Sequence, residues 1–129
     1  MKNCFCGSDQ PFSKCCAPII NGIANAASAE KLMRSRYSAY VVADVDYLIA
    51  STHSSERHSL IRKEITDWAK SNSWKGLEII KADTFTVEFK ANFRNRSGKL
   101  ETHHEKSTFV YEGGNWFYKD GVFNDDIKN

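Results

Sequence analysis

The chain has 129 residues, 41% of them hydrophobic and 12% aromatic, which is enough for one domain with one core. Its 18 lysines and arginines nearly balance 16 aspartates and glutamates, which argues against nucleic-acid or membrane binding through charge alone. No apolar run reaches the roughly 20 residues of a membrane span, and no apolar signal core follows Met1. We therefore expect a cytoplasmic protein without membrane contact, in a compartment where thiols stay reduced.

The cysteines are clustered at the start of the chain, at Cys4, Cys6, Cys15 and Cys16. In a reducing compartment such a cluster favours a metal site over disulfides, and four thiolates suit tetrahedral zinc. Because a full set of four ligands leaves no open coordination position, we predict one structural Zn²⁺ per chain. A disulfide, a redox pair and an iron–sulfur cluster are the alternatives. The spacing lacks the C-x-x-C of redox pairs and the usual spacings of clusters.

Residues 4–16 resemble the SEC-C motif, whose pattern is roughly C-P-C-G-S-G-x-x-[YF]-x-x-C-[CH]. The four cysteines and the pair Gly7-Ser8 fall in place together. Phe5 replaces the usual proline and Asp9 the usual glycine, and neither position is a ligand. The motif is named for the C-terminal tail of the SecA translocase ATPase, where it resembles a docking tail for a chaperone and the ribosome. The resemblance implies a protein or ribosomal partner reached through the zinc knuckle.

The helical part of the chain follows the knuckle. We predict a zinc knuckle over residues 1–18, a linker over 19–28 and a second domain over 29–129. Ser28 suits a helix N-cap, and apolar residues then recur at helical spacing, which predicts a helix over residues 29–43. Asp44 caps a short second helix, and Ser55 opens a third one with an apolar stripe that runs to Ala69.

After Gly76 the hydrophobic period changes to two. Residues 77–81 and 84–94 predict two strands, and residues 95–98 predict a hairpin turn. A return strand over 100–112, a turn at Gly113-Gly114 and a last strand at 116–119 complete an antiparallel meander. Helices followed by strands predict an α+β fold, in which three helices pack on one face of a curved antiparallel sheet of about four strands.

Several segments of this body carry a second resemblance: Leu32–Tyr40, Asp46–Leu48 with His53, Phe93-Arg94, His104–Phe109 and Trp116–Gly121. They resemble the YchJ-like family of uncharacterised bacterial proteins, over nearly the whole chain and in the same order. The resemblance implies a cystatin-like fold of the nuclear-transport-factor-2 (NTF2) type, a cone of bent sheet and helices around a cavity. Many members carry a second SEC-C motif at the C-terminus, which residues 125–129 lack, so we expect no function that needs two knuckles.

A cone implies a cavity, and several polar and aromatic residues suit its wall. Arg36 lies on the apolar side of the first predicted helix, where it either packs its stem on the core or binds an anion. His104 and Glu105 are adjacent on a strand, so only one of them can enter the cavity, and Glu105 shares its side with Ser107 and Phe109. We expect His103 to face solvent and Asp120-Gly121 to form a turn. The candidate cavity residues are Arg36, Tyr37, Tyr40, His53, Trp68, Phe93, His104, Ser107, Trp116 and Tyr118.

Two function hypotheses follow. The first, which we favour, is an adaptor that docks through its zinc knuckle, because the set of four cysteine ligands is complete and no catalytic signature occurs. There is no phosphate-cradling glycine loop, Gly-x-Ser-x-Gly elbow or dinucleotide fingerprint. The second is a small-molecule binder or an enzyme that uses the cavity. Single-stranded nucleic-acid binding by the knuckle is disfavoured by the near-neutral charge.

Overall fold

The computed structural model describes residues 2–123; residues 124–129, which carry the end of the predicted domain, lie outside that range. The chain runs through six helical elements and then four strands: η1 (Phe12–Lys14), α1 (Ala17–Ile20), α2 (Ala29–Val42), α3 (Val45–Ala50), η2 (Ser54–Ser59), α4 (Arg62–Ser71), β1 (Ser73–Ala82), β2 (Thr86–Arg94), β3 (Leu100–Glu112) and β4 (Asn115–Phe123).

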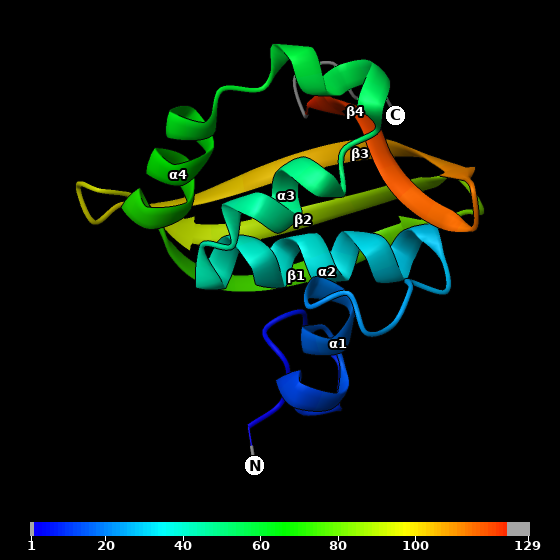
Figure 1. The fold of residues 1–129 in the computed structure, drawn as a ribbon. Coiled ribbons are helices and arrows are strands. Elements are labelled where there is room, and N and C mark those ends of the chain that lie inside the picture. Colours follow the sequence, from blue (N-terminus) through cyan, green and yellow to red (C-terminus); the bar gives the residue numbers. More distant parts are fainter. Residues whose placement is uncertain (1, 124–129) are drawn as a thin grey trace.

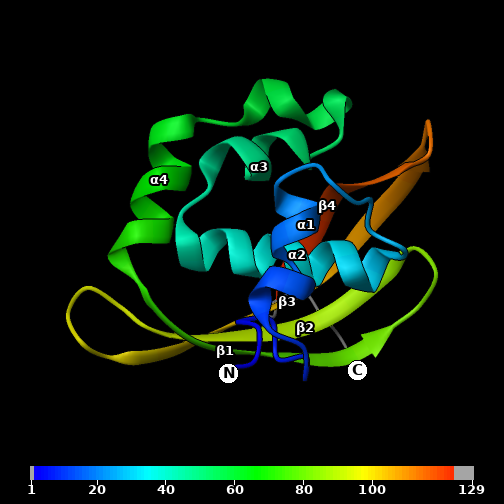
Figure 2. The ribbon, with the colours of Figure 1, turned by 60° about the horizontal axis from the view of Figure 1, so that its bottom comes forward.

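The strands form one antiparallel sheet in the order β1-β2-β3-β4. The sheet curves beneath the helices, which lie on one side of it, and the N-terminal segment with α1 lies against the outer side of α2 (Figures 1 and 2). This confirms the predicted α+β fold. None of the described helices combines the length and the apolarity that crossing a bilayer requires.

Helix α2 supplies much of the core because its apolar residues recur every three or four positions. It begins where the Ser28 hydroxyl accepts a hydrogen bond from the Lys31 amide at 3.1 Å, and it ends at Ala43, which has a left-handed φ of 58°. Asp44 then caps α3 by accepting from the Tyr47 amide at 3.0 Å. The main core joins α2 to the concave face of the sheet through Ala29, Leu32, Met33, Tyr37, Val87, Phe89, Ala91 and Phe109.

The third predicted helix is split in two, so its expected start at Ser55 was wrong. Residues 54–59 form the 3₁₀ helix η2, and His53 caps it by accepting from the Ser55 amide at 3.2 Å. Leu60 and Ile61 are extended, and α4 begins only at Arg62. The apolar spacing is the same on either side of the break, which is why periodicity alone did not reveal it.

Three register shifts interrupt the sheet of residues 73–123 and change which side chains share a face. The pairing of β1 with β2 shifts between Trp74 and Gly76 and again between Ile79 and Lys81. In β4, Thr108 pairs with Asp120 but Phe109 pairs with Tyr118, so that Lys119 is an extra residue. Because side chains alternate along a regular strand, this bulge brings Tyr118 and Gly121 to the same face.

The connection between α3 and η2 runs beside β4 at the edge of the sheet. The Tyr118 amide donates to the Ser51 carbonyl at 2.8 Å, and the His53 amide donates to the Tyr118 carbonyl at 2.7 Å. Thr52 and Tyr118 thereby form a short parallel bridge. This pairing fixes Thr52 at the wall of the cavity described below.

Candidate metal centre and cavity

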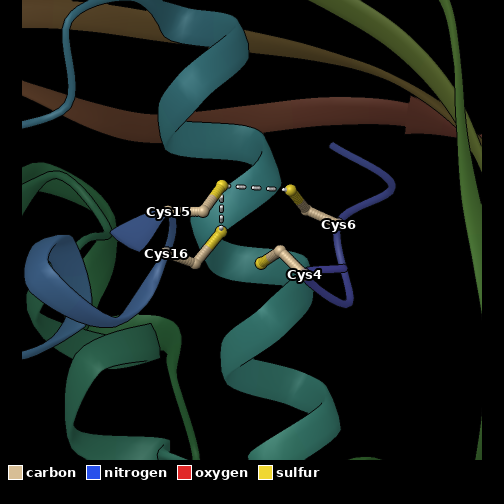
Figure 3. A group of neighbouring side chains, drawn as sticks. All are labelled: Cys4, Cys6, Cys15 and Cys16. Atoms are coloured by element: carbon tan, nitrogen blue, oxygen red, sulfur yellow. Dashed lines mark hydrogen bonds between the residues drawn. The ribbon is translucent and has the colours of Figure 1, made fainter. Parts of the chain in front are cut away.

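The four cysteines converge on one point at the N-terminal end of the molecule. Their sulfur atoms lie within 4.8 Å of one another, with 3.7 Å between Cys6 and Cys15 and 3.9 Å between Cys15 and Cys16 (Figure 3). A tetrahedral zinc with Zn–S bonds near 2.3 Å requires sulfurs about 3.8 Å apart. Each cysteine is at most 4% exposed. The donor set therefore fits a tetrahedral metal ion bound by four thiolates.

Hydrogen-bond donors surround this sulfur cluster. The Ser8 hydroxyl lies 3.1 Å from the Cys15 sulfur, and the Lys31 ammonium donates to the same sulfur at 2.8 Å. The Ser38 hydroxyl lies 3.6 Å from the Cys4 sulfur. A closed site with four thiolates and one divalent ion carries a net charge of −2, and these donors offset it.

The knuckle formed by residues 4–16 rests on α2 and β1. Arg34 donates from Nη1 to the Cys6 carbonyl at 2.6 Å and from Nε to Glu30 at 2.9 Å. Ile20 of α1 and Leu77 of β1 pack against the sulfur cluster. The cluster thus joins the first 16 residues to the main domain.

A hydrogen bond between Cys6 and Cys16, together with burial, keeps these two thiols from ionising together. A hydrogen bond from Cys16, aided by those at Ser8, lowers the pKa of Cys6 to about 4, and the same bond raises the pKa of Cys16. Burial alone would lower the pKa of Lys31, but its bond to Cys15 raises it. A divalent cation would bind all four sulfurs as thiolates and displace the remaining thiol proton, which couples metal binding to proton release.

A separate cavity of about 360 Å³ lies between the helices and the concave face of the sheet. Its volume falls within the ~300–1,000 Å³ of small-molecule sites. Aromatic side chains from three elements line one part of it: Tyr40 from α2, Trp68 from α4 and Trp74 from β1. The ring centroids of Trp68 and Trp74 lie 6.0 Å apart, edge to face, and those of Tyr40 and Trp74 lie 5.6 Å apart. We call these three residues the aromatic wall.

Six of the ten residues proposed from the sequence line this cavity: Arg36, Tyr37, Tyr40, Trp68, Ser107 and Tyr118. The other four lie elsewhere. His104 points to the outer face, where its Nε2 lies 2.7 Å from a Glu88 carboxylate oxygen. His104 and Ser107 are three residues apart on a strand without a shift between them, so alternation excludes that both face inward.

His53, Phe93 and Trp116 also occupy other places. His53 caps η2 and lies 3.2 Å from Glu112, outside the cavity. Phe93 is buried behind the aromatic wall, 5.2 Å from the Trp68 ring. Trp116 packs at the far end of the sheet between Phe85 and Tyr111, at centroid distances of 5.5 and 5.2 Å.

Two titratable residues of the cavity, His103 and Glu105, were missing from the sequence-based set. Glu105 is 6% exposed, and its Oε1 lies 2.8 Å from Nε2 of His103. Its Oε2 accepts from the Ser107 hydroxyl at 2.6 Å and from the Tyr118 hydroxyl at 2.9 Å. The sequence held the signal, because Glu105 is a carboxylate on the side of the strand that also carries Ser107 and Phe109. His103, expected to face solvent, shares that side.

Hydrogen bonds keep Glu105 ionised inside the protein. Burial alone would raise its pKa, but the bonds from His103, Ser107 and Tyr118 outweigh burial and lower it below its ordinary value. Burial and the negative charge of Glu105 raise the pKa of the Tyr118 hydroxyl, which therefore remains a donor. A histidine held by a carboxylate can accept a proton while the carboxylate stabilises the resulting imidazolium.

Arg36 is the positive charge of the cavity. It is 7% exposed, and its guanidinium lies over the Tyr118 ring, 4.5 Å from the centroid. Its Nη1 donates to the Leu48 carbonyl at 2.9 Å, to the Ser51 hydroxyl at 2.7 Å and to the Thr52 hydroxyl at 3.3 Å. The segment paired to β4 therefore holds Arg36 in place.

Comparison with known proteins identifies the family. Residues 28–121 match the family model described as the middle NTF2-like domain of YchJ. A UPF0225 protein of Geobacter sulfurreducens is 40% identical over 125 residues, which cover 92% of this chain and 77% of that protein. The chain belongs to the YchJ-like family. A UPF0225 protein of Serratia proteamaculans is 39% identical to this YchJ-like chain over 126 residues, covering 92% of it and 82% of that protein.

Two solved structures are similar to the YchJ-like chain over nearly its whole length. One is the solution structure of a SEC-C motif containing protein from Rhodopseudomonas palustris, with a TM-score of 0.87 and 34% identity, covering 94% of this chain and 98% of that one. The other is the crystal structure of a SEC-C motif containing protein from Psychrobacter arcticus, with a TM-score of 0.77 and 27% identity, covering 99% of this chain and 86% of that one. Both resemblances seen in the sequence are thereby confirmed.

The buried Glu105 makes the free energy of unfolding of this YchJ-like chain depend on pH in the acid range. Because its pKa in the folded state lies below its ordinary value of 4.5, its contribution to stability is complete above about pH 4.5 and is lost as the pH falls through the folded-state pKa. Urea unfolding between pH 7 and pH 3 should therefore show a steeper acid loss in wild type than in Glu105→Gln. The comparison variant is Glu88→Gln, which removes a histidine-bonded carboxylate from the outer face. Equal acid slopes in wild type and Glu105→Gln would contradict the prediction.

Proposed function

We propose that this protein binds a small organic molecule in the cavity of its NTF2-like domain, while a zinc ion bound by the four cysteines holds the knuckle against α2. The observation that carries the proposal is the pair of opposite charges, Arg36 and Glu105, buried on the wall of one cavity beside the aromatic wall. Arginine and glutamate are rarely buried this deeply without a structural or functional reason, and apolar cavities with a few polar groups are typical ligand sites.

The zinc is assigned a structural role. Four buried thiolates complete a tetrahedron, so no position is left for a substrate or a reactive water. When bound, the ion supplies a positive charge that holds the four thiolates together, and Ser8, Lys31 and Ser38 offset the remaining negative charge. We place the protein in the cytoplasm, because a reducing compartment leaves the cysteines available for metal.

A metabolite and fragment screen by thermal shift tests the cavity proposal. A ligand at 100 times its Kd should stabilise the folded state by about 2.7 kcal/mol. The variant Ala91→Leu fills part of the cavity and should lose the shift, whereas Ala82→Leu, on the exposed end of β1, should keep it. If no compound of any chemical class shifts the melting temperature, or if Ala91→Leu keeps every shift, the proposal fails.

The second candidate is the adaptor, with a protein or ribosomal partner bound through the knuckle. The observation that favours it is Phe5, which is 44% exposed on the knuckle, 5.2 Å from the ring of Phe12. Because Phe5 is not a ligand, Phe5→Ala should keep the metal while it weakens docking. Affinity capture followed by mass spectrometry compares the two proteins, and identical partner sets for wild type and Phe5→Ala would count against the adaptor.

A further inference from the structure

The geometry of Arg36 points to the class of ligand. We propose that the cavity binds a small organic carboxylate with an apolar or aromatic body, and that Arg36 holds the carboxylate group. This inference rests on the proposed function, since it assigns a ligand class to the same cavity.

One edge of the Arg36 guanidinium is open. A guanidinium carries five N–H donors, and the protein acceptors of Arg36 all bind its Nη1. Among residues 2–123, no group accepts a hydrogen bond from its Nε or Nη2, and no fully buried side-chain nitrogen or oxygen lacks a partner. Nε and Nη2 are therefore accessible, and Arg36 lines the cavity. Their N–H groups form the parallel fork that binds a carboxylate through both oxygens.

The charges of the cavity favour a ligand with a single negative charge. Within the described part of the chain, Arg36 takes part in no ion pair, although it is 7% exposed. Glu105 lies beyond the Tyr118 ring and already accepts three hydrogen bonds. A buried cation without an anionic partner is costly, and a ligand anion relieves that cost. A second negative charge on the ligand would be repelled by the Glu105 carboxylate, which would weaken binding.

The aromatic wall indicates the body of the ligand. Tyr40 lies one helical turn beyond Arg36 on α2, and both line the cavity. A carboxylate on Arg36 therefore directs the rest of a small molecule toward Tyr40, Trp68 and Trp74, where rings stack well and polar groups find few partners. The volume of about 360 Å³ limits the ligand to a small molecule.

Calorimetric and NMR titrations of the full chain with matched compounds test this inference. The probes are benzoate and phenylacetate, their neutral amides benzamide and phenylacetamide, and inorganic phosphate. We expect the acids to bind at least about tenfold more tightly than the amides, because the amides lack the charge that strengthens a bidentate pair. Arg36→Gln should abolish that preference. Arg62→Gln, which changes an exposed arginine, should leave it intact.

The wild-type protein supplies a measurement that survives if Arg36→Gln does not fold. The Nε–H resonance of Arg36 should move on addition of benzoate and stay in place with benzamide. Amides that bind in the cavity as tightly as the acids, or phosphate that binds while both acids do not, overturn the inference and leave the cavity proposal standing. If neither these probes nor the wider screen bind, both proposals fall.

Discussion

Replacing Gly121 by alanine is expected to destabilise the protein by about 3 kcal/mol, the upper part of the range for overpacked cores. Gly121 lies on β4 directly opposite Ser107, and a Cβ atom at this position would overlap the carboxylate of Glu105. The added methyl group would push Glu105 away from its hydrogen-bond donors, so the cost includes a disturbed buried charge. Equilibrium unfolding in urea measures the effect. The turn that the sequence predicted at Asp120-Gly121 is wrong, because both residues lie within β4.

A second substitution separates this overlap from a general intolerance of the strand. Glu105→Ala removes the group that the new methyl would meet, so the double variant Gly121→Ala with Glu105→Ala should lose less stability than the sum of the two single changes. Val122→Ala, at the exposed neighbouring position, should cost little. Additive effects in the cycle would show that the carboxylate does not require glycine at position 121.

Replacing Cys16 by serine is expected to abolish metal binding and to release residues 4–16 from α2. Cys16 is fully buried, and structural zinc sites in small peptides supply on the order of 10–16 kcal/mol of binding free energy. Elemental analysis should find one zinc per chain in wild type and none in Cys16→Ser. The melting temperature should fall as well, because the cluster packs against Leu77 of the sheet.

The control for this change is Lys14→Ala, an exposed position in the same segment that supplies no sulfur. A chelator added to wild type should reproduce the Cys16→Ser melting curve, and zinc added back should restore it. Freshly reduced wild type without metal would falsify the zinc assignment and move attention to the redox chemistry of the cysteines. Iron in place of zinc would keep the site and change its chemistry.

Local signals in the sequence predicted much of the fold. Ser28 and Asp44 act as the expected caps, and α2 follows its predicted bounds to within one residue. The alternation in β2 and β3 placed Glu105 with Ser107 and Phe109, as the structure does. The four cysteines were predictable as one cluster because ligand chemistry constrains their spacing more tightly than packing constrains a core residue.

Other parts of the site depend on contacts between distant segments. The break at Leu60 and Ile61 leaves the apolar spacing unchanged, so the pattern predicted one helix where the structure has two elements. The sequence left two interpretations of Arg36 open, a stem packed on the core or an anion-binding group. The position of its guanidinium depends on Ser51 and Thr52, which are held by pairing with β4. The prediction that His104 lines the cavity was inconsistent with the alternation of β3, because His104 and Ser107 lie on opposite faces of that strand.

The extra residue Lys119 has a consequence for the number of residues in β4. Removing it would restore plain alternation and leave Tyr118 and Gly121 two residues apart, so that both would stay on the cavity face and Gly121 would stay opposite Ser107. A one-residue deletion here therefore removes the bulge without turning a cavity residue to the outer face. When relatives are aligned, a one-residue gap between Tyr118 and Gly121 is therefore compatible with the same carboxylate site.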